Sequence, residues 1–252
     1  MERGYQYNLS RIHHDKLYDR EGRERKARTA AAVLSDFLSN DLSGLTVLDV
    51  GSSTGIVGSY LSGFFGKVIG IDIDREAVEF ARQAFPKSNL EFRLGDAVNL
   101  DFEDQTFSVV ICMHVYEHVP DANKLISEIY RVLNPGGVCY FAAGNRLNIN
   151  EAHYELPFLS VIPRPLAHVY MRLAGKGNYY YEKHLSYWGL KKLARRFEII
   201  DYTKRIIEAP GLFQAEYMVR PGTITGALAK AVAHYAFWLC PSYIWLLRKP
   251  NY

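Results

Sequence analysis

Three acidic side chains follow three short apolar segments, where they could bind a positively charged ligand. Asp49 lies in the stretch VLDVGSSTG (47–55), Asp72 in VIGIDID (68–74) and Asp96 in LGDA (94–97). A carboxylate attracts a cation and accepts hydrogen bonds from hydroxyl and amino groups. The three residues therefore predict a site for a ligand that combines positive charge with hydrogen-bond donors.

The glycine-bearing turn after the first segment limits what that ligand can be. Gly51, Ser52, Ser53 and Gly55 join an apolar run to a helical pattern, and glycine in such a turn lets a ligand approach the backbone closely. A nicotinamide dehydrogenase also has such a turn, but here Ser53 replaces the second glycine of GxGxxG, and Asp49 would repel a pyrophosphate. S-adenosylmethionine (SAM) carries an ammonium and a sulfonium cation, so we predict SAM as the cofactor.

The two later acids have separate expected roles. Asp72 ends a strand about 20 residues after the turn, the distance at which an acid accepts hydrogen bonds from ribose hydroxyls. Asp74 is expected to cap the helix that follows instead. Asp96 is expected to lie against the amino group of adenine.

Alternating strands and helices must bring these residues together. Apolar runs predict strands at 46–50, 67–71, 90–93, 107–112 and 138–143, and helical patterns lie at 21–38, 55–64, 75–85 and 123–133. This order indicates a parallel sheet with helices on both faces, whose ligands bind beyond the carboxyl ends of the strands. After an interruption rich in proline and tyrosine, we expect a helix at 187–196, a strand at 197–207, a further helix and a last strand at 243–248.

Composition narrows the class of protein. With 252 residues, 48% apolar and 23% charged, the chain is expected to form one α/β domain, and a net charge of +3 does not indicate a nucleic acid partner. The basic run at 20–28 is expected to be the solvated face of a helix. The three cysteines have no zinc or disulfide spacing and are expected to be buried thiols: Cys112, Cys139 and Cys240.

The ends of the chain bear on location. The stretch MERGYQYNLSRIHHDK has no apolar core, so no signal peptide and a cytoplasmic location are expected. The apolar segment 231–247 approaches the length of a membrane span, but Pro241 is expected to divide it into a helix and a strand. A peripheral membrane contact through this segment is a further expectation.

Four stretches together resemble the class I SAM-dependent methyltransferases (methyltransferase type 11), in particular the family that includes quinone-biosynthesis enzymes: VLDVGSSTG, VIGIDID, LGDAVNLDFEDQTFSVVICMHVYEHVPD and EIYRVLNPGG. The resemblance covers about residues 45–143. It implies an α/β, Rossmann-like doubly wound sheet of seven strands, mostly parallel with an antiparallel last strand. The expected sections are an N-terminal helical lid (1–44), a SAM-binding core (45–144), an acceptor-binding cap inserted between strands five and six (145–187) and a C-terminal part that completes the sheet (188–252).

The resemblance also assigns residues to the parts of SAM. The turn 51–55 would hold the methionine part, Asp72 with Ile73 the ribose, and Asp96 with Ala97 the adenine. Met113 and His114 would line the methyl-bearing side, and the product would be S-adenosylhomocysteine. Ser53 departs from the glycine of the family, which its small side chain is expected to make tolerable.

The stretch from His114 to His118 resembles a second element, ExxEH. In quinone O-methyltransferases and small-RNA 2′-O-methyltransferases those side chains bind a divalent ion that orients the acceptor oxygen. Here His114 replaces the first Glu, and the related KGTH segment reads Lys176-Gly177-Asn178-Tyr179. We therefore expect no metal site, although His153 or His184 could restore a ligand.

Methyl transfer from a sulfonium is an in-line displacement, which requires the acceptor about 3 Å from the methyl carbon and a base only where the acceptor must lose a proton. For a hydroxyl acceptor the candidate bases are His114 first and His153 second. The aromatic cap favours a small or lipid-like acceptor. O-methylation is favoured, while N and C acceptors, a non-catalytic SAM-binding protein and a dehydrogenase stay open as alternatives.

Overall fold

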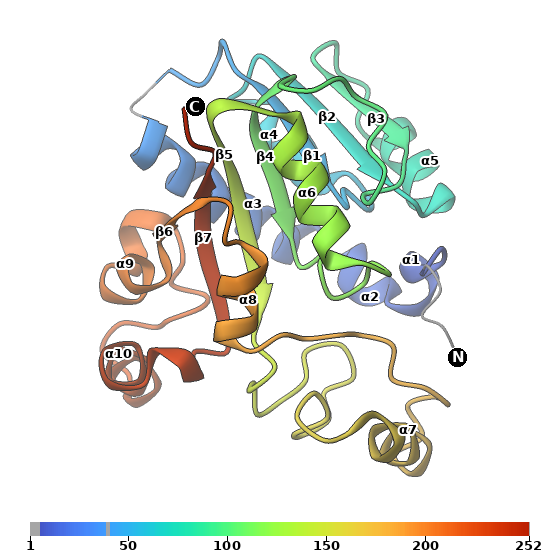
Figure 1. Cartoon of the computed structure of the whole chain (residues 1–252), viewed down its shortest axis with the longest axis vertical. Coiled ribbons are helices and arrows are strands. Elements are labelled where there is room, and N and C mark those ends of the chain that lie inside the picture. Colours follow the sequence, from blue (N-terminus) through green and yellow to red (C-terminus); the bar gives the residue numbers. More distant parts are fainter. Residues whose placement is uncertain (1–5, 39–40, 252) are drawn as a thin grey trace.

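A seven-stranded sheet forms the centre of the computed structural model, which describes residues 6–38 and 41–251 (Figure 1). The strand order is β3-β2-β1-β4-β5-β7-β6, and the first five strands run parallel, while β7 is antiparallel to both β5 and β6. This arrangement confirms the predicted mostly parallel α/β sheet with an antiparallel last strand. The bounds are β1 (Thr46–Val50), β2 (Lys67–Asp72), β3 (Leu90–Leu94), β4 (Phe107–Met113), β5 (Leu133–Gly144), β6 (Glu198–Asp201) and β7 (Ser242–Arg248).

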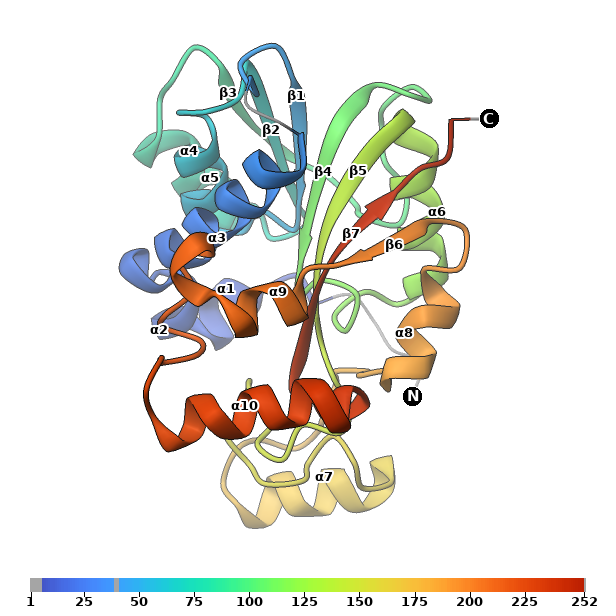
Figure 2. The ribbon, with the colours of Figure 1, turned by 90° about the vertical axis from the view of Figure 1, so that its left-hand side faces the viewer.

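Helices cover both faces of the sheet, as Figure 2 shows. On one face lie α3 (Arg20–Leu38), α4 (Ile56–Leu61) and α5 (Arg75–Ala84), and on the other lie α6 (Ala122–Val132) and α8 (Tyr187–Leu193). The central strands are therefore buried on both sides, which explains their continuous apolar runs. The predicted helices on both faces are confirmed.

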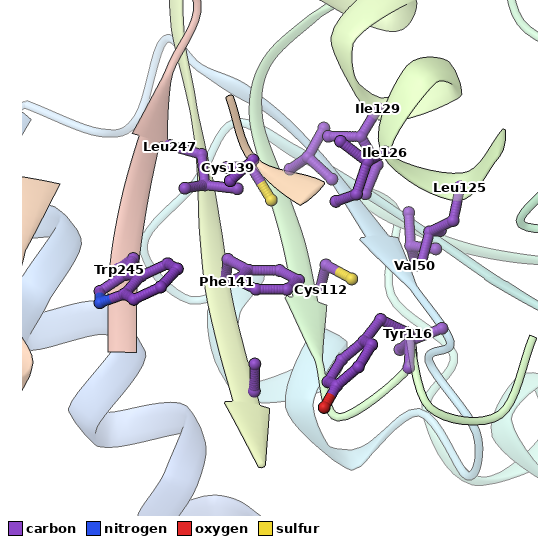
Figure 3. Packing of buried hydrophobic residues seen from close by; sticks show 14 of the residues in the cluster. Val50, Cys112, Tyr116, Leu125, Ile126, Ile129, Cys139, Phe141, Trp245 and Leu247 are labelled. Carbon is purple, nitrogen blue, oxygen red and sulfur yellow. The ribbon is translucent and has the colours of Figure 1, made fainter. Parts of the chain in front are cut away.

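The core on the α6 face contains side chains of β1, β2, β4, β5 and β7 and of the helices α6 and α8, and Figure 3 shows part of it. Cys112 of β4, Phe141 of β5 and Trp245 of β7 are all fully buried, and Leu125 and Ile129 of α6 pack over them. All three cysteines are buried and free, as predicted. This rigid layer fixes the strand ends, from which the loops of the site leave.

Two sequence-based element predictions need correction. The strand expected at 197–207 ends at Asp201, because the Asp201 carboxylate accepts a hydrogen bond from the backbone N–H of Thr203 at 2.7 Å and starts a helix there, α9 (Thr203–Glu208). The strand predicted at 138–143 begins earlier, at Leu133, so the segment Asn134-Pro135-Gly136-Gly137 lies within β5. The 3₁₀ helix η1 (Pro210–Phe213) follows α9.

The remaining elements surround the carboxyl edge of the sheet. They are α1 (Leu9–Ile12), α2 (His14–Leu17), α7 (Arg164–Leu173), α10 (Ile224–Tyr235) and η2 (Phe237–Leu239). Pro241 separates the last helical segment from β7, as expected. Of the section 1–44, residues 1–5 and 39–40 lie outside the described residues. Within the described chain, every helix is too short or too polar to cross a bilayer.

Asp74 ties the N-terminal segment to the core. Its carboxylate accepts a hydrogen bond from the backbone N–H of Ala77, which caps α5 as predicted, and another from the N–H of Ser10 at 2.8 Å. Thr54 donates a further hydrogen bond to the carbonyl of Leu17. The helices α1 and α2 are thereby held against the strand ends.

We expect Asp74→Ala to lower the free energy of unfolding by about 1–3 kcal/mol, because it removes a helix cap and leaves the buried N–H of Ser10 without its acceptor. Urea denaturation measures this loss. Glu79→Ala, an exposed change on the same helix, is the control and is expected to change stability by less than about 0.5 kcal/mol. Equal losses in both variants would contradict the role of Asp74.

Candidate functional site

A cavity of about 390 Å³ opens at the carboxyl ends of β1, β2, β4 and β5. We call it the cofactor cavity. The predicted site residues that line it are Gly51, Ser53, Asp72, Ile73, Asp96, Ala97, Met113, His114 and His153, whereas Asp49, Ser52 and Gly55 lie behind its wall. The topology thus brings most of the predicted residues to one space.

The turn between β1 and α4 is held in an unusual backbone conformation. Gly51, Ser53 and Gly55 all have positive φ, at 73°, 50° and 75°, and the N–H groups of Gly51 and Ser52 both donate to the carbonyl of Ile71 at 2.9 Å. A Cβ on Gly51 would lie 2.6 Å from Val115 Cγ2. The positive φ at position 53 explains why the family has glycine there. The small side chain of Ser53 reduces steric conflict with a ligand but does not remove the conformational cost of a positive φ.

The two acids nearest the turn are differently placed. Asp72 accepts hydrogen bonds from the N–H groups of Ser53 at 2.7 Å and Asp74 at 2.9 Å. Asp49 is only 3% exposed, and its Oδ2 has no hydrogen-bond partner among the described residues. Burial raises the pKa of Asp49 to about 7, and the guanidinium of Arg23 opposes this shift only in part.

Arg23 is a site residue that the sequence analysis missed. Its neighbours in the basic run of α3 pair with Glu21 and Glu24 at the surface, as predicted, but Arg23 and Lys26 line the cofactor cavity. The Nε of Arg23 is buried without a hydrogen-bond partner among the described residues. A signal existed: Arg23 lies one helical turn before Ala27, which is fully buried.

A cluster of histidines and glutamates also contributes to the wall of the cavity. The His–Glu cluster consists of Glu117, His118, Glu151, His153, Glu182 and His184, and every member except Glu182 lines the cavity. All three carboxylates are buried. The cap supplies four of the six residues, and the loop after β4 supplies Glu117 and His118.

Short contacts connect the cluster. His153 Nδ1 lies 2.6 Å from Glu151 Oε1, and His184 Nε2 lies 3.2 Å from the same oxygen. His118 Nδ1 lies 2.8 Å from Gln6 Oε1, and its Nε2 lies 3.1 Å from His153 Nε2. Since a carboxylate and an amide oxygen only accept hydrogen bonds, both Nδ1 atoms carry hydrogen and the two Nε2 atoms face each other.

Protonation in the cluster follows from these contacts. Burial favours a neutral Glu117, but the nearby imidazoles of His114, His118 and His184 lower the pKa of its carboxyl to about 2. Burial also opposes charge on Glu151 and His153, but their mutual hydrogen bond lowers the pKa of Glu151 and raises that of His153. The cluster therefore holds buried carboxylates whose ionised form is favoured by neighbouring imidazoles.

Two groups within the cluster have the spacing of metal ligands: Glu117, His118 and His153, and Glu151, His153 and His184. Both oxygens of Glu117 are buried and without a hydrogen-bond partner among the described residues. The sequence analysis named His153 and His184 as substitute ligands but gave no reason to include Glu151. No spacing in the sequence predicts that the cap contacts the loop after β4.

His114, the first candidate base, is held less firmly by its neighbours than His153 is. It lines the cavity with φ +56°, and its Nδ1 lies 3.6 Å from Glu117 Oε1, which is longer than a hydrogen bond. Its side chain is 40% exposed. His153, the second candidate, is more buried and is oriented by a carboxylate.

Comparison with known proteins agrees with this geometry. The family model described as "Methyltransferase domain" matches residues 48–141. The chain is 32% identical over 204 residues to the demethylmenaquinone methyltransferase of Lactococcus lactis subsp. lactis (strain IL1403), which covers 78% of this chain and 74% of that protein. It is 31% identical over 157 residues to the ubiquinone biosynthesis O-methyltransferase of Thiobacillus denitrificans (strain ATCC 25259 / T1), covering 61% of this chain and 64% of that protein.

A solved structure shares the fold: the S-adenosylmethionine dependent methyltransferase from Mesorhizobium loti, with a TM-score of 0.55, 17% identity and coverage of 85% of this chain and 95% of that one. The fold, the cavity and the relatives together define an enzyme that transfers a methyl group. The chain belongs to the methyltransferase-domain family, and its cofactor is SAM.

The residues present suit this cofactor. The unpartnered Asp49 and the cavity-lining Asp72 and Asp96 provide the negative charge that a sulfonium and an ammonium group require. A dinucleotide would place phosphates beside the same carboxylates. The predicted methyltransferase class is thus confirmed, and the individual contacts to SAM stay predictions.

We expect SAM binding to release up to one proton near pH 6.5. A cationic ligand favours the ionised form of Asp49, so SAM lowers its pKa from about 7, and affinity rises as pH increases toward 7 and then levels off. Isothermal titration calorimetry in two buffers of different ionisation enthalpy measures the proton count. Asp49→Asn should bind SAM more weakly and without proton release; unchanged release would assign the proton to another group.

Proposed function

We propose that this enzyme methylates a hydroxyl group of a small, lipid-like acceptor. One observation carries the proposal: a single cavity joins the strand-end acids Asp72 and Asp96 to the His–Glu cluster. The first set suits a cationic cofactor, and the second offers a base beside it. Two relatives carry names from quinone metabolism, and one of them is named an O-methyltransferase, which supports an oxygen on a small molecule.

Each end of the cavity has a distinct task in this proposal. When bound, SAM supplies an activated methyl group on its sulfonium. The turn at Gly51 and Ser53 would receive the methionine part, Asp72 and Ile73 the ribose, and Asp96 and Ala97 the adenine. Arg23, which lines the cavity from α3, would bind the methionine carboxylate. Met113 and His114 would lie between cofactor and acceptor.

His153 would act as the general base. Glu151 fixes its Nδ1–H, so Nε2 points toward His118 and the cavity. The acceptor hydroxyl would give its proton to this imidazole pair as its oxygen bonds to the methyl carbon, while the carbon–sulfur bond would break and S-adenosylhomocysteine would leave. His114 takes second place, because the contact that would orient it is 3.6 Å long.

A lipid-like acceptor agrees with the outer surface beside the cavity. Apolar side chains of the cap helix α7 and of α10 are exposed, among them Leu166, Leu173, Ile224 and Tyr235. A peripheral membrane contact through the C-terminal segment would use α10. This contact is part of the proposal.

Removal of the carboxylate beside His153 should shift the pH profile. The pKa of His153 is raised, so kcat/KM should increase with pH as the imidazole loses its proton. In Glu151→Gln the imidazolium is no longer stabilised, its pKa falls, and the acidic limb should move to lower pH.

His153→Ala should lower kcat about 100-fold or more with little change in SAM affinity. Radiolabelled methyl transfer to a metabolite extract supplies the assay.

Glu155→Gln is the matched control, because this exposed glutamate lies in the same segment. It should leave the profile unchanged. If His114→Ala abolishes turnover while His153→Ala does not, the base is His114 and the order proposed here is wrong.

The cluster also favours a second way to activate the hydroxyl, a divalent ion bound by Glu117, His118 and His153. Two facing Nε2 atoms 3.1 Å apart beside an unpartnered buried carboxylate suit a metal as well as a shared proton. Such an ion would orient the acceptor oxygen. Activation by a metal ion and activation by His153 alone predict opposite effects of a chelator on turnover.

If His153 acts as the base, kcat should be the same with and without EDTA, and calorimetric titration with Zn²⁺ or Mg²⁺ should show no site that Glu117→Gln removes. Loss of turnover in EDTA, with a metal site that disappears in Glu117→Gln but persists in the surface variant Glu103→Gln, would instead establish the ion. The titration reads the site independently of activity.

A further inference from the structure

A second cavity, of about 300 Å³, lies beside the cofactor cavity. We call it the apolar cavity. It is bordered by α9, α10, the end of η2 and the start of β7, and the described residues that line it include no charged side chain. Apolar side chains predominate, among them Ile206, Met218, Val219, Leu228, Ala229 and Val232. Thr203, one of its few polar residues, has its hydroxyl bonded to the backbone of Ile244. The lining therefore favours a hydrocarbon ligand, because it presents few free hydrogen-bonding groups.

The two cavities share a wall. Pro241 and Ser242 line both of them. Ser242 is paired with Gly144 in the sheet, and Gly144 lines the cofactor cavity. Asn145 holds this wall in place, because its Nδ2 donates to the carbonyls of Trp238 and Cys240 at 2.8 Å. The two cavities therefore meet at Pro241, which is exposed, and at Ser242, which is partly buried.

The helix that closes the apolar cavity is poorly buried. Of the twelve residues of α10, only Gly226 and Ala233 are buried, and Ile224 is 88% exposed. Figures 1 and 2 both place α10 beside α9, at the end of the sheet from which the cap also extends. A helix packed this loosely over an apolar space can separate from it at low cost.

We propose that the apolar cavity binds the hydrocarbon tail of the methyl acceptor, while the hydroxyl-bearing head lies in the cofactor cavity. The proposal rests on the proposed function and adds the place where a lipid-like acceptor is recognised. Burial of the tail among α9, α10 and β7 supplies affinity, and the shared wall at Pro241 and Ser242 sets the register between tail and head.

A series of straight-chain primary alcohols tests this site in the full chain with SAM present. Calorimetry should show affinity rising about fourfold for each added methylene from hexanol until the cavity is full. Ala229→Phe fills the cavity from α10 and should weaken decanol binding at least tenfold. Met218→Trp narrows it from a partly exposed position and should do the same, even if Ala229→Phe does not fold.

Ala227→Phe is the matched control, because it lies on α10 outside the cavity and is exposed. It should leave decanol binding unchanged, and SAM should bind all variants equally. Absence of decanol binding, or equal weakening by Ala227→Phe and Ala229→Phe, would overturn the proposal. Failure of SAM binding or of methyl transfer in the wild-type chain would instead reject the proposed function, so the two failures are distinguishable.

Discussion

Buried negative charge is the constraint on which the site depends. A carboxylate removed from water is costly unless a cation or several hydrogen-bond donors face it. Burial raises the pKa of Asp49 to about 7, because the guanidinium of Arg23 compensates its charge only in part. Glu151 is compensated by His153 and His184 at hydrogen-bond distance. Asp49 therefore lacks full compensation for its charge, whereas Glu151 has two imidazoles at hydrogen-bond distance.

The sheet turns this constraint into a reaction geometry. Parallel strands place all their carboxyl ends at one edge, so acids that are far apart in the chain line one cavity. The cap then returns over the same edge and brings Glu151, His153 and His184 against the loop that follows β4. In the proposed function, the strand ends therefore supply the residues for the cofactor, and the insertion supplies most of the groups for acceptor chemistry.

The sheet and the glycine-bearing turn could be predicted from sequence because their signals are local. Apolar runs, the turn 51–55 and the helix cap Asp74 each depend on neighbours a few residues away. The contact between His118 and His153 joins positions 35 residues apart in the sequence, and no periodic pattern specifies it. Arg23 was missed for another reason: surface pairs surround it, and only the buried Ala27 one turn later shows which way it points. The strand predicted across Asp201 was wrong because one Asx turn outweighed the β propensity of Ile206 and Ile207.

The topology of the sheet explains why Pro241 and Ser242 line both cavities. β7 is the antiparallel strand, so its first residues lie beside the last residues of β5 at the functional edge. The start of β7 therefore lines the cofactor cavity, and α10, which precedes β7 in the chain, lies close to that cavity. The antiparallel strand therefore brings α10, in which only Gly226 and Ala233 are buried, next to the place where methyl transfer is proposed. In a wholly parallel sheet the last strand would begin at the opposite edge, and this arrangement would be lost.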